Sequence, residues 1–159
     1  MSIHFIFVLI FMFLIYQAAR DSFWLGSWIR LPGTLAHELA HLFVGFLTNA
    51  KPATMSLLPK KEGKSVVLGE ALFTNMTWYN AALVGFAPLL LIFITLILDR
   101  YARSVHDVTV NLFWSFIEAN LLLASVPSST DIKVATRHSL MVVIFSGCVL
   151  GLLWKSGFL

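Results

Sequence analysis

Apolar residues dominate this chain and are gathered into five stretches, separated by short segments that carry most of the charge. Each stretch approaches the roughly 20 apolar residues that a helix needs to cross the hydrocarbon core of a bilayer. The stretches cover residues 3–19, 22–48, 78–98, 108–126 and 134–154. The pattern predicts an all-α integral membrane bundle of about five transmembrane helices.

The second stretch is interrupted by Arg30 and by Pro32-Gly33. We expect one long helix over residues 22–48 that tilts or kinks at the proline, with Arg30 snorkelling or finding a polar partner. The alternative is an interfacial segment, Ser22–Leu31, followed by a short helix, Thr34–Leu47. In the first interpretation the middle of the stretch lies at intermediate membrane depth.

The segment between the second and third stretches has a different character. It contains four lysines and the breakers Pro52, Pro59 and Gly63, with strand-like runs on both sides of the basic centre Lys60–Lys64. This pattern predicts a small β-hairpin with a basic tip over residues 53–73. An ordinary solvated loop is the alternative.

Composition agrees with a membrane location. The chain of 159 residues is 58% hydrophobic and 12% charged, whereas soluble domains carry about 25% charged residues. This length leaves room for a single membrane-embedded domain over residues 1–159. Residues 3–19 lack a basic leader, so we expect an uncleaved first transmembrane helix rather than a signal peptide.

Basic residues indicate orientation rather than nucleic-acid binding. The net charge is +3, and the basic residues are scattered over the connecting segments. With five spans, six of them fall on the side of the N-terminus and four on the other side. The positive-inside rule then favours a cytoplasmic N-terminus and hairpin. We expect a bacterial or archaeal cytoplasmic membrane, with an active site that opens to the cytoplasmic side.

Candidate chemistry lies in the second stretch, in the sequence His37-Glu38-Leu39-Ala40-His41. Residues i and i+4 of a helix lie on one face, so His37 and His41 can supply two nitrogen ligands to a tetrahedral zinc ion. Glu38 lies about 100° round the helix from His37, where it can act as general base toward a water at the metal. Ionisable side chains at membrane depth are costly and usually functional.

A catalytic zinc site needs a third protein ligand. We favour Asp131, because non-helical backbone at membrane depth survives where it lines a wet cavity, and Ser128-Ser129-Thr130 supply polar groups there. Asp131 could instead, or in addition, be the N-cap of the following helix. Glu118 is the second choice, and its alternative role is a buried carboxyl paired with Arg30 or another polar group. Two further candidates are Glu70 and His138.

These features, in this order, resemble the site-2 protease family of intramembrane zinc metalloproteases. An HExxH motif, His37–His41, lies in a predicted transmembrane helix and is followed by a β-type connection at residues 53–73. Gly85-Phe86-Ala87-Pro88 is similar to the family's small-residue Gly-Pro motif. Asn120, Pro127 and Asp131 are similar to its later Asn/Pro/Asp motif.

The resemblance implies a minimal core enzyme without a PDZ or regulatory domain. It implies one zinc ion per chain held by His37, His41 and Asp131, with Glu38 as the catalytic base and Asn120 binding the substrate backbone. The implied substrate is a transmembrane protein, cleaved in or near its membrane segment.

Other functions fit the same residues. Five spans with buried His, Glu and Asp could belong to a metal-ion transporter, or to a pseudoprotease adaptor that binds substrates without cutting them. A membrane-anchored zinc hydrolase acting on soluble substrates is a third alternative. The chain shows no repeat between its halves, which transporters commonly have, and the complete His-Glu-His set favours an active protease.

Overall fold

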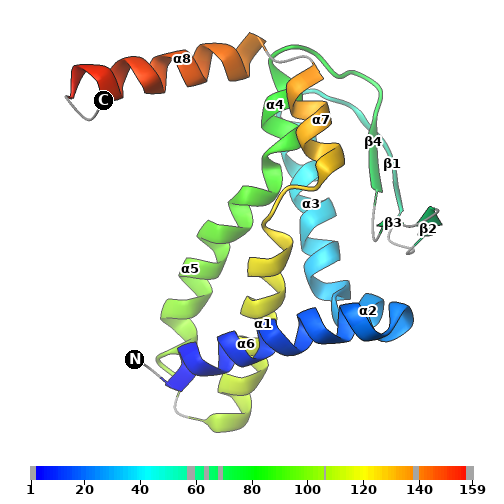
Figure 1. The fold of residues 1–159 in the computed structure, drawn as a ribbon, viewed down its shortest axis with the longest axis vertical. Helices are drawn as coiled ribbons and strands as arrows, with labels where there is room; N and C mark the ends of the chain where they lie inside the picture. Colours follow the sequence, from blue (N-terminus) through cyan, green and yellow to red (C-terminus); the bar gives the residue numbers. More distant parts are fainter. Residues whose placement is uncertain are drawn as a thin grey trace.

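A computed structural model describes residues 3–56, 60–62, 65–67, 70–105, 107–137 and 140–156 (Figure 1). Over these residues the chain is mainly helical, with two small antiparallel sheets inserted after the third helix. The helical elements are α1 (Ile3–Asp21), α2 (Phe23–Ile29), α3 (Leu31–Leu47), α4 (Asn80–Gly85), the 3₁₀ turn η1 (Ala87–Leu89), α5 (Leu90–Ala102), α6 (Val108–Ala124), α7 (Ser129–Arg137) and α8 (Leu140–Lys155). The prediction of a helical protein with one β-type insertion is confirmed.

Helix α1 lies across one end of the group formed by α3, α5 and α6, while α8 extends from the opposite end (Figure 1). One stripe of α1 is buried, and it includes Val8 and Ile15, which cluster with Ala119 of α6. Phe11 and Phe116 add an edge-to-face ring contact at 5.7 Å between the ring centres. The spacing of Val8 and Ile15 is the helical one, so α1 packs as an amphipathic element although its sequence is apolar all round.

The prediction of one kinked helix over residues 22–48 is wrong. Helix α2 ends at Ile29 and α3 begins at Leu31, with Arg30 half-buried at the corner between them. Pro32 explains the break, because its nitrogen has no hydrogen to donate and its ring is accepted only in the first turn of a helix. The chain therefore follows the two-piece alternative.

The prediction of one helix over residues 78–98 is also wrong in its detail. The segment is divided into α4, η1 and α5, with Phe86 between the first two. Pro88 lies inside this break, where a continuous helix would lose a hydrogen bond. Helix α5 then continues to Ala102, beyond the predicted end.

The last two predicted spans differ in outcome. Helix α6 agrees with the predicted span 108–126, starts at the N-cap Asp107 and ends ahead of Pro127. Residues 134–154 do not form one helix, since α7 ends at Arg137 and a separate helix, α8, begins at Leu140. The Ser-rich break after Pro127 starts a new helix of its own, and α6 and α7 meet at a bend of 45°.

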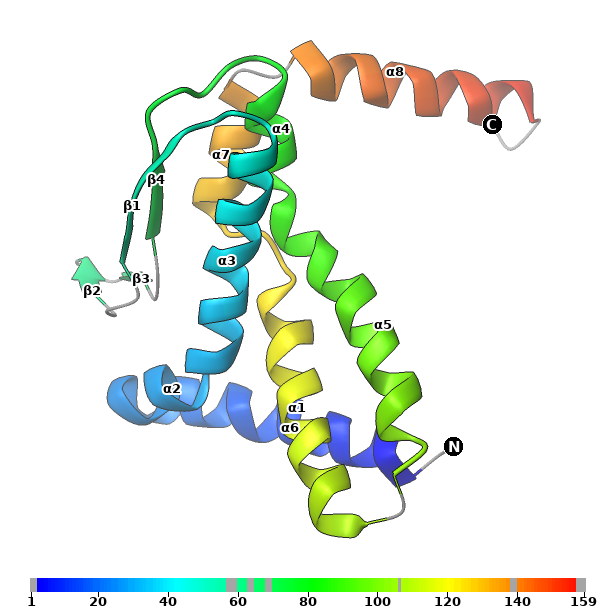
Figure 2. The same ribbon diagram turned by 180° about the vertical axis from the view of Figure 1, so that it is seen from behind.

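The β-type insertion agrees with the prediction for residues 53–73. Strand β1 (Pro52–Ser56) pairs antiparallel with β4 (Glu70–Phe73), and β2 (Lys60–Glu62) pairs with β3 (Ser65–Val67). The β1–β4 pair lies alongside α3 (Figure 2). Gly45 of α3 allows this approach, because a Cβ there would collide with the ring of Phe73.

Length and composition together identify few membrane-crossing helices among the described residues. Helix α1 is long and apolar enough to cross a membrane, and α6 with α7 also qualifies if their bent pair is one span. Helix α3 has 17 residues, which rise only about 26 Å. The described structure thus supports one or two of the five predicted spans.

Candidate metal centre

Two segments that are distant in sequence bring three ligand groups together. His37 and His41 project from α3, and Asp131 lies in the first turn of α7. The Nε2 atoms of the two histidines are 3.2 Å apart. The carboxylate of Asp131 lies 3.3 Å from His37 Nε2 and 3.1 Å from His41 Nε2. The preferred choice of third ligand is therefore placed beside both histidines.

His37 is oriented by the end of α6. Its Nδ1 atom donates a hydrogen bond of 2.6 Å to the carbonyl oxygen of Ala124, the last residue of that helix. Terminal carbonyls of a helix have no partner within the helix, and this one is left for the imidazole. A proton on Nδ1 leaves the Nε2 lone pair facing Asp131, which is the tautomer that binds a metal ion.

His41 is oriented in the same way by the break in the third apolar segment. Its Nδ1 atom donates to the carbonyl oxygen of Val84 at 2.8 Å. In a continuous helix that carbonyl would accept from the residue four positions later, which is Pro88 and has no N–H. Pro88 thus leaves the Val84 carbonyl available for the histidine.

Asp131 is held by the start of α7. Its Oδ2 atom accepts from the backbone N–H of Ser128 at 2.6 Å, and its own N–H donates to Ser128 Oγ at 3.1 Å. This reciprocal pair is a capping box in which Ser128 is the N-cap and Asp131 the third helical residue. The alternative that Asp131 is itself the N-cap is wrong.

Gly85 allows α7 to approach closely enough for this contact. A Cβ on Gly85 would lie 2.6 Å from the carbonyl oxygen of Asp131 and 2.7 Å from the Cβ of Ala135. Both distances are far below van der Waals contact, so only glycine fits between the two helices. Gly85 was singled out by its resemblance to a family motif, and the structure supplies a physical reason for it.

The three groups fit a zinc ion by distance and by chemistry. Ligands about 2.0–2.1 Å from a tetrahedral zinc ion are separated from one another by roughly 3.3 Å. The two Nε2 atoms are 3.2 Å apart, Asp131 Oδ2 lies 3.3 Å from His37 Nε2, and Asp131 Oδ1 lies 3.1 Å from His41 Nε2. Two neutral imidazoles and one carboxylate form a donor set that zinc accepts, and the side chains of His37, His41 and Asp131 are 14%, 6% and 15% exposed. The site is largely enclosed, with limited access from solvent at His37 and Asp131.

Glu38 is buried on α3, at 5% exposure, directly after His37. Seven residues separate it from Gly45, so both lie on one face of the helix, two turns apart. Gly45 is the position against which Phe73 of β4 packs. The predicted base therefore faces the side of α3 along which the β1–β4 pair runs.

Asn120 is buried in α6, and its side-chain amide donates to the carbonyl of Phe116 in the same helix at 3.2 Å. Its backbone carbonyl lies against Gly33 of α3, where an added Cβ would come within 2.6 Å. Asn120 is one turn before Ala124, whose carbonyl orients His37. It lies in the α3–α6 contact, and its predicted role in binding substrate stays a prediction.

Glu118 is not part of this site. Its carboxylate pairs with His4 of α1 at 3.1 Å, so its suggested role as third ligand is wrong. The alternative of a buried carboxyl with a polar partner is confirmed, and that partner is His4. Helix periodicity explains the outcome, since Glu118 faces α1 whereas Ala124 faces α3. Glu70 lies in β4, and His138 falls outside the described residues.

Sequence reasoning missed the backbone groups that orient the two histidines. The signal for Val84 was present, because a proline four residues after a helical residue always frees that residue's carbonyl. The signal for Ala124 was the end of the helix ahead of Pro127. No family model, curated protein or solved structure matches this chain.

Proposed function

We propose that this protein is an intramembrane zinc metallopeptidase, similar to the site-2 proteases, that hydrolyses a peptide bond in or near a transmembrane segment of a substrate protein. The observation that carries the proposal is the convergence of His37 Nε2, His41 Nε2 and the Asp131 carboxylate within 3.1–3.3 Å. Both Nδ1 atoms are meanwhile committed to backbone carbonyls. Such fixed tautomers favour metal binding over a simple hydrogen-bonded cluster.

Glu38 gives the site a hydrolytic chemistry. In the proposed reaction Glu38 accepts the proton of the attacking water and then returns it to the leaving nitrogen of the peptide. His37, His41 and Asp131 would hold zinc, which when bound would supply a Lewis acid that polarises the scissile carbonyl. Burial of Glu38 in an apolar helix keeps competing solvent away from this proton transfer.

The proposed membrane location rests on the surface of the molecule. Large apolar side chains are exposed along α1, α3 and α5, among them Phe13, Phe46 and Ile97 at 61%, 77% and 69%. Monomeric soluble proteins rarely expose apolar patches of such extent, whereas a bilayer covers them. Helix α1 has the length to span it, and so has the α6–α7 pair if the bent pair is one span.

The β1–β4 pair is the proposed site of substrate presentation. A peptide bond inside a helix is shielded, so the substrate must be extended to reach Glu38. Two-stranded sheets have an unpaired edge on each strand, and an extended peptide can add to such an edge through main-chain hydrogen bonds. Phe73 packs β4 against the face of α3 that carries Glu38, and this packing supports the proposed role of the edge.

Cleavage in a reconstituted system tests the proposal. The full chain is inserted into liposomes with a single-span membrane protein, and fragments are measured with zinc, after chelation and after zinc is restored. We expect cleavage that requires zinc and is lost in Glu38→Gln, which keeps its zinc. Asp21→Asn is the matched control, because this exposed carboxylate at the end of α1 lies outside the site.

Wild-type cleavage rates in Glu38→Gln would exclude the proposed base. Zinc-dependent metal flux across substrate-free liposomes, without cleavage, would instead favour the transporter. The two results are separable because flux needs no substrate protein, and cleavage needs no ion gradient.

A further inference from the structure

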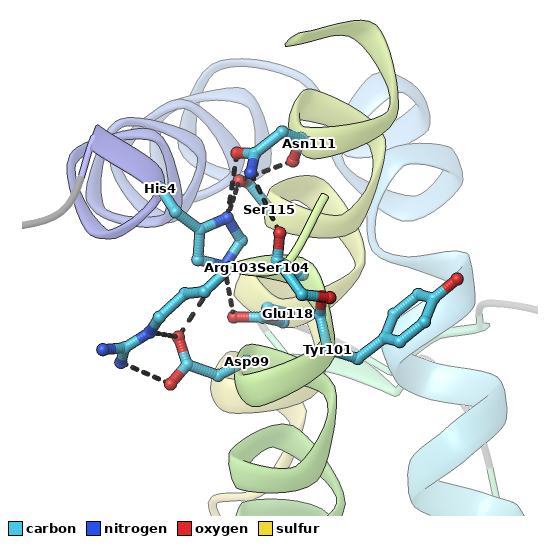
Figure 3. Close-up of polar contacts among 9 residues, drawn as sticks. His4, Asp99, Tyr101, Arg103, Ser104, Asn111, Ser115 and Glu118 are labelled. Carbon is cyan, nitrogen blue, oxygen red and sulfur yellow. Dashed lines mark hydrogen bonds and ion pairs between the residues drawn. The ribbon is translucent and has the colours of Figure 1, made fainter. Parts of the chain in front are cut away.

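A second cluster of ionisable side chains lies at the crossing of α1 with the rest of the molecule (Figure 3). His4 of α1, Asp99 of α5 and Glu118 of α6 each point into it. His4 Nε2 lies 3.1 Å from Glu118 Oε2 and 3.8 Å from Asp99 Oδ1. His4 and Glu118 are each 2% exposed, so two of the three groups are buried.

The tautomer of His4 is fixed by its neighbours. The amide nitrogen of Asn111 donates to the carbonyl of Ala102 at 3.2 Å, which turns the amide oxygen of Asn111 toward His4 Nδ1 at 3.0 Å. That oxygen is an acceptor, so Nδ1 must carry a proton. Ser115 Oγ, 2.9 Å from the same nitrogen, is also available as an acceptor because its hydroxyl donates to the Asn111 carbonyl.

The opposite nitrogen, Nε2, therefore faces the carboxylates of Glu118 and Asp99, as His37 and His41 face Asp131 at the first site. Two acceptors cannot approach to 3.1 Å without a proton or a cation between them. Glu118 Oε1 is a second atom that needs a positive partner, since it is buried and has no hydrogen-bond partner among the described residues. A buried carboxylate oxygen without a partner is costly, and a bound cation removes that cost.

We propose that His4, Asp99 and Glu118 bind a second divalent transition-metal ion, separate from the His37–His41–Asp131 site. One imidazole nitrogen and two carboxylates suit zinc, manganese or iron, whereas calcium and magnesium favour all-oxygen sets. The three donor atoms lie within 4.8 Å of one another, close enough to share one ion.

Arg103 is compatible with this role for Asp99. Its guanidinium makes two hydrogen bonds with the carboxylate of Asp99 and lies on the solvent side, 54% exposed. Each carboxylate oxygen has two lone pairs, so Asp99 Oδ1 can accept from Arg103 and still ligate a cation.

A cavity of about 290 Å³ lies beside the cluster, at His4. His4, Arg103 and Asn111 are among the residues that line it. Three protein donors leave at least one coordination position, which water in this cavity can fill. The ion would join three helices, α1, α5 and α6, and fasten the N-terminal helix across the others.

Zinc counting on the full-length protein tests the proposal. The detergent-purified chain is stripped of metal, equilibrated with Zn²⁺ alone and analysed for zinc per chain. We expect about two ions in the wild type, about one in Asp131→Asn, about one in Glu118→Gln and none in the double variant. Asp21→Asn, a carboxylate change outside both clusters, should keep about two.

The zinc content of the wild type and of Asp131→Asn tests whether a second ion is bound, and neither protein is changed in the second cluster. One zinc in the wild type and none in Asp131→Asn would overturn the proposal, and a proton shared between His4 and Glu118 would then fill the gap. Two zinc ions that persist in Glu118→Gln would also overturn it, because the second ion would lie elsewhere. Zinc at the His37–His41–Asp131 site is counted separately from zinc at the second site. A failure of the proposed peptidase function in the cleavage experiment is therefore distinguishable from a failure of the second-site proposal.

Discussion

The Nδ1 atom of His41 donates a hydrogen bond to the carbonyl oxygen of Val84 at 2.8 Å, joining two segments 43 residues apart. This contact exists because Pro88 supplies no N–H to the same oxygen. A proline that breaks one helix therefore orients a ligand on another. Outer contacts of this kind tune metal affinity, since they set both the tautomer and the direction of the ring.

Pro88→Ala should weaken zinc binding while leaving the three ligands in place. Alanine restores an N–H that can compete with His41 for the Val84 carbonyl, so we expect about a tenfold loss of zinc affinity. A competition titration with a chelator measures it. Pro52→Ala, at the start of β1, is the matched control. Equal affinity in the wild type and Pro88→Ala would mean that the Val84 contact does not orient His41.

Gly85→Ala should displace α7 and with it Asp131. The new Cβ would meet the Asp131 carbonyl and Ala135, which cannot move without shifting the helix. We expect a loss of about 1–3 kcal/mol in stability, together with weaker zinc binding. Thermal unfolding followed by circular dichroism, with and without zinc, gives both quantities.

Gly151→Ala is the control for this change, because a Cβ at Gly151 of α8 meets nothing within 4 Å. Alanine is also the better helix former, so Gly151→Ala should be neutral or slightly stabilising. Equal behaviour of the two variants would contradict a close α4–α7 contact at Gly85.

Ser128→Ala should loosen the first turn of α7. Its Oγ accepts from the N–H of Asp131, and loss of an N-cap costs about 1 kcal/mol. A looser Asp131 should bind zinc roughly fivefold more weakly, as that energy implies. Isothermal titration measures the change, with Ser129→Ala as the neighbouring control. An unchanged zinc affinity would show that the backbone N–H of Ser128 alone positions the carboxylate.

The side of the membrane on which the hairpin lies is a separate prediction. Six basic residues, including Lys60, Lys61 and Lys64, fall on the predicted cytoplasmic side. A reporter that works only in the cytoplasm should therefore be active when it is fused after Lys61, and a reporter that works only outside the cytoplasm should be inactive there. Activity of an extracytoplasmic reporter at this position would reverse the orientation of the whole chain.

Local features were predictable where the physics is local. His37 and His41 share a face because the helical repeat places residues four apart together, whatever surrounds the helix. The insertion at residues 53–73 followed from its breakers and alternating pattern, and it is present as β1–β4 and β2–β3. The choice of Asp131 as third ligand rested on the same kind of local evidence, a polar break after Pro127.

Helix continuity was less predictable, because apolar stretches do not show where a helix stops. The breaks at Arg30 and Phe86 each lie within two residues of a proline, yet a proline in the first turn and one in a kink look alike in sequence. Only packing selects between them. A Cβ at Gly26 would collide with the backbone of Ala19, so the close contact between α2 and α1 depends on glycine at this position.

The sequence by itself determined the ligand types, their helical spacing and the apolar surroundings of His37 and His41. Tertiary structure alone decided that Asp131 meets them, that Val84 and Ala124 orient them, and that Glu118 belongs with His4. The reason is distance along the chain: contacts between residues 43 to 114 positions apart depend on how whole helices pack, and residue spacing carries no record of that.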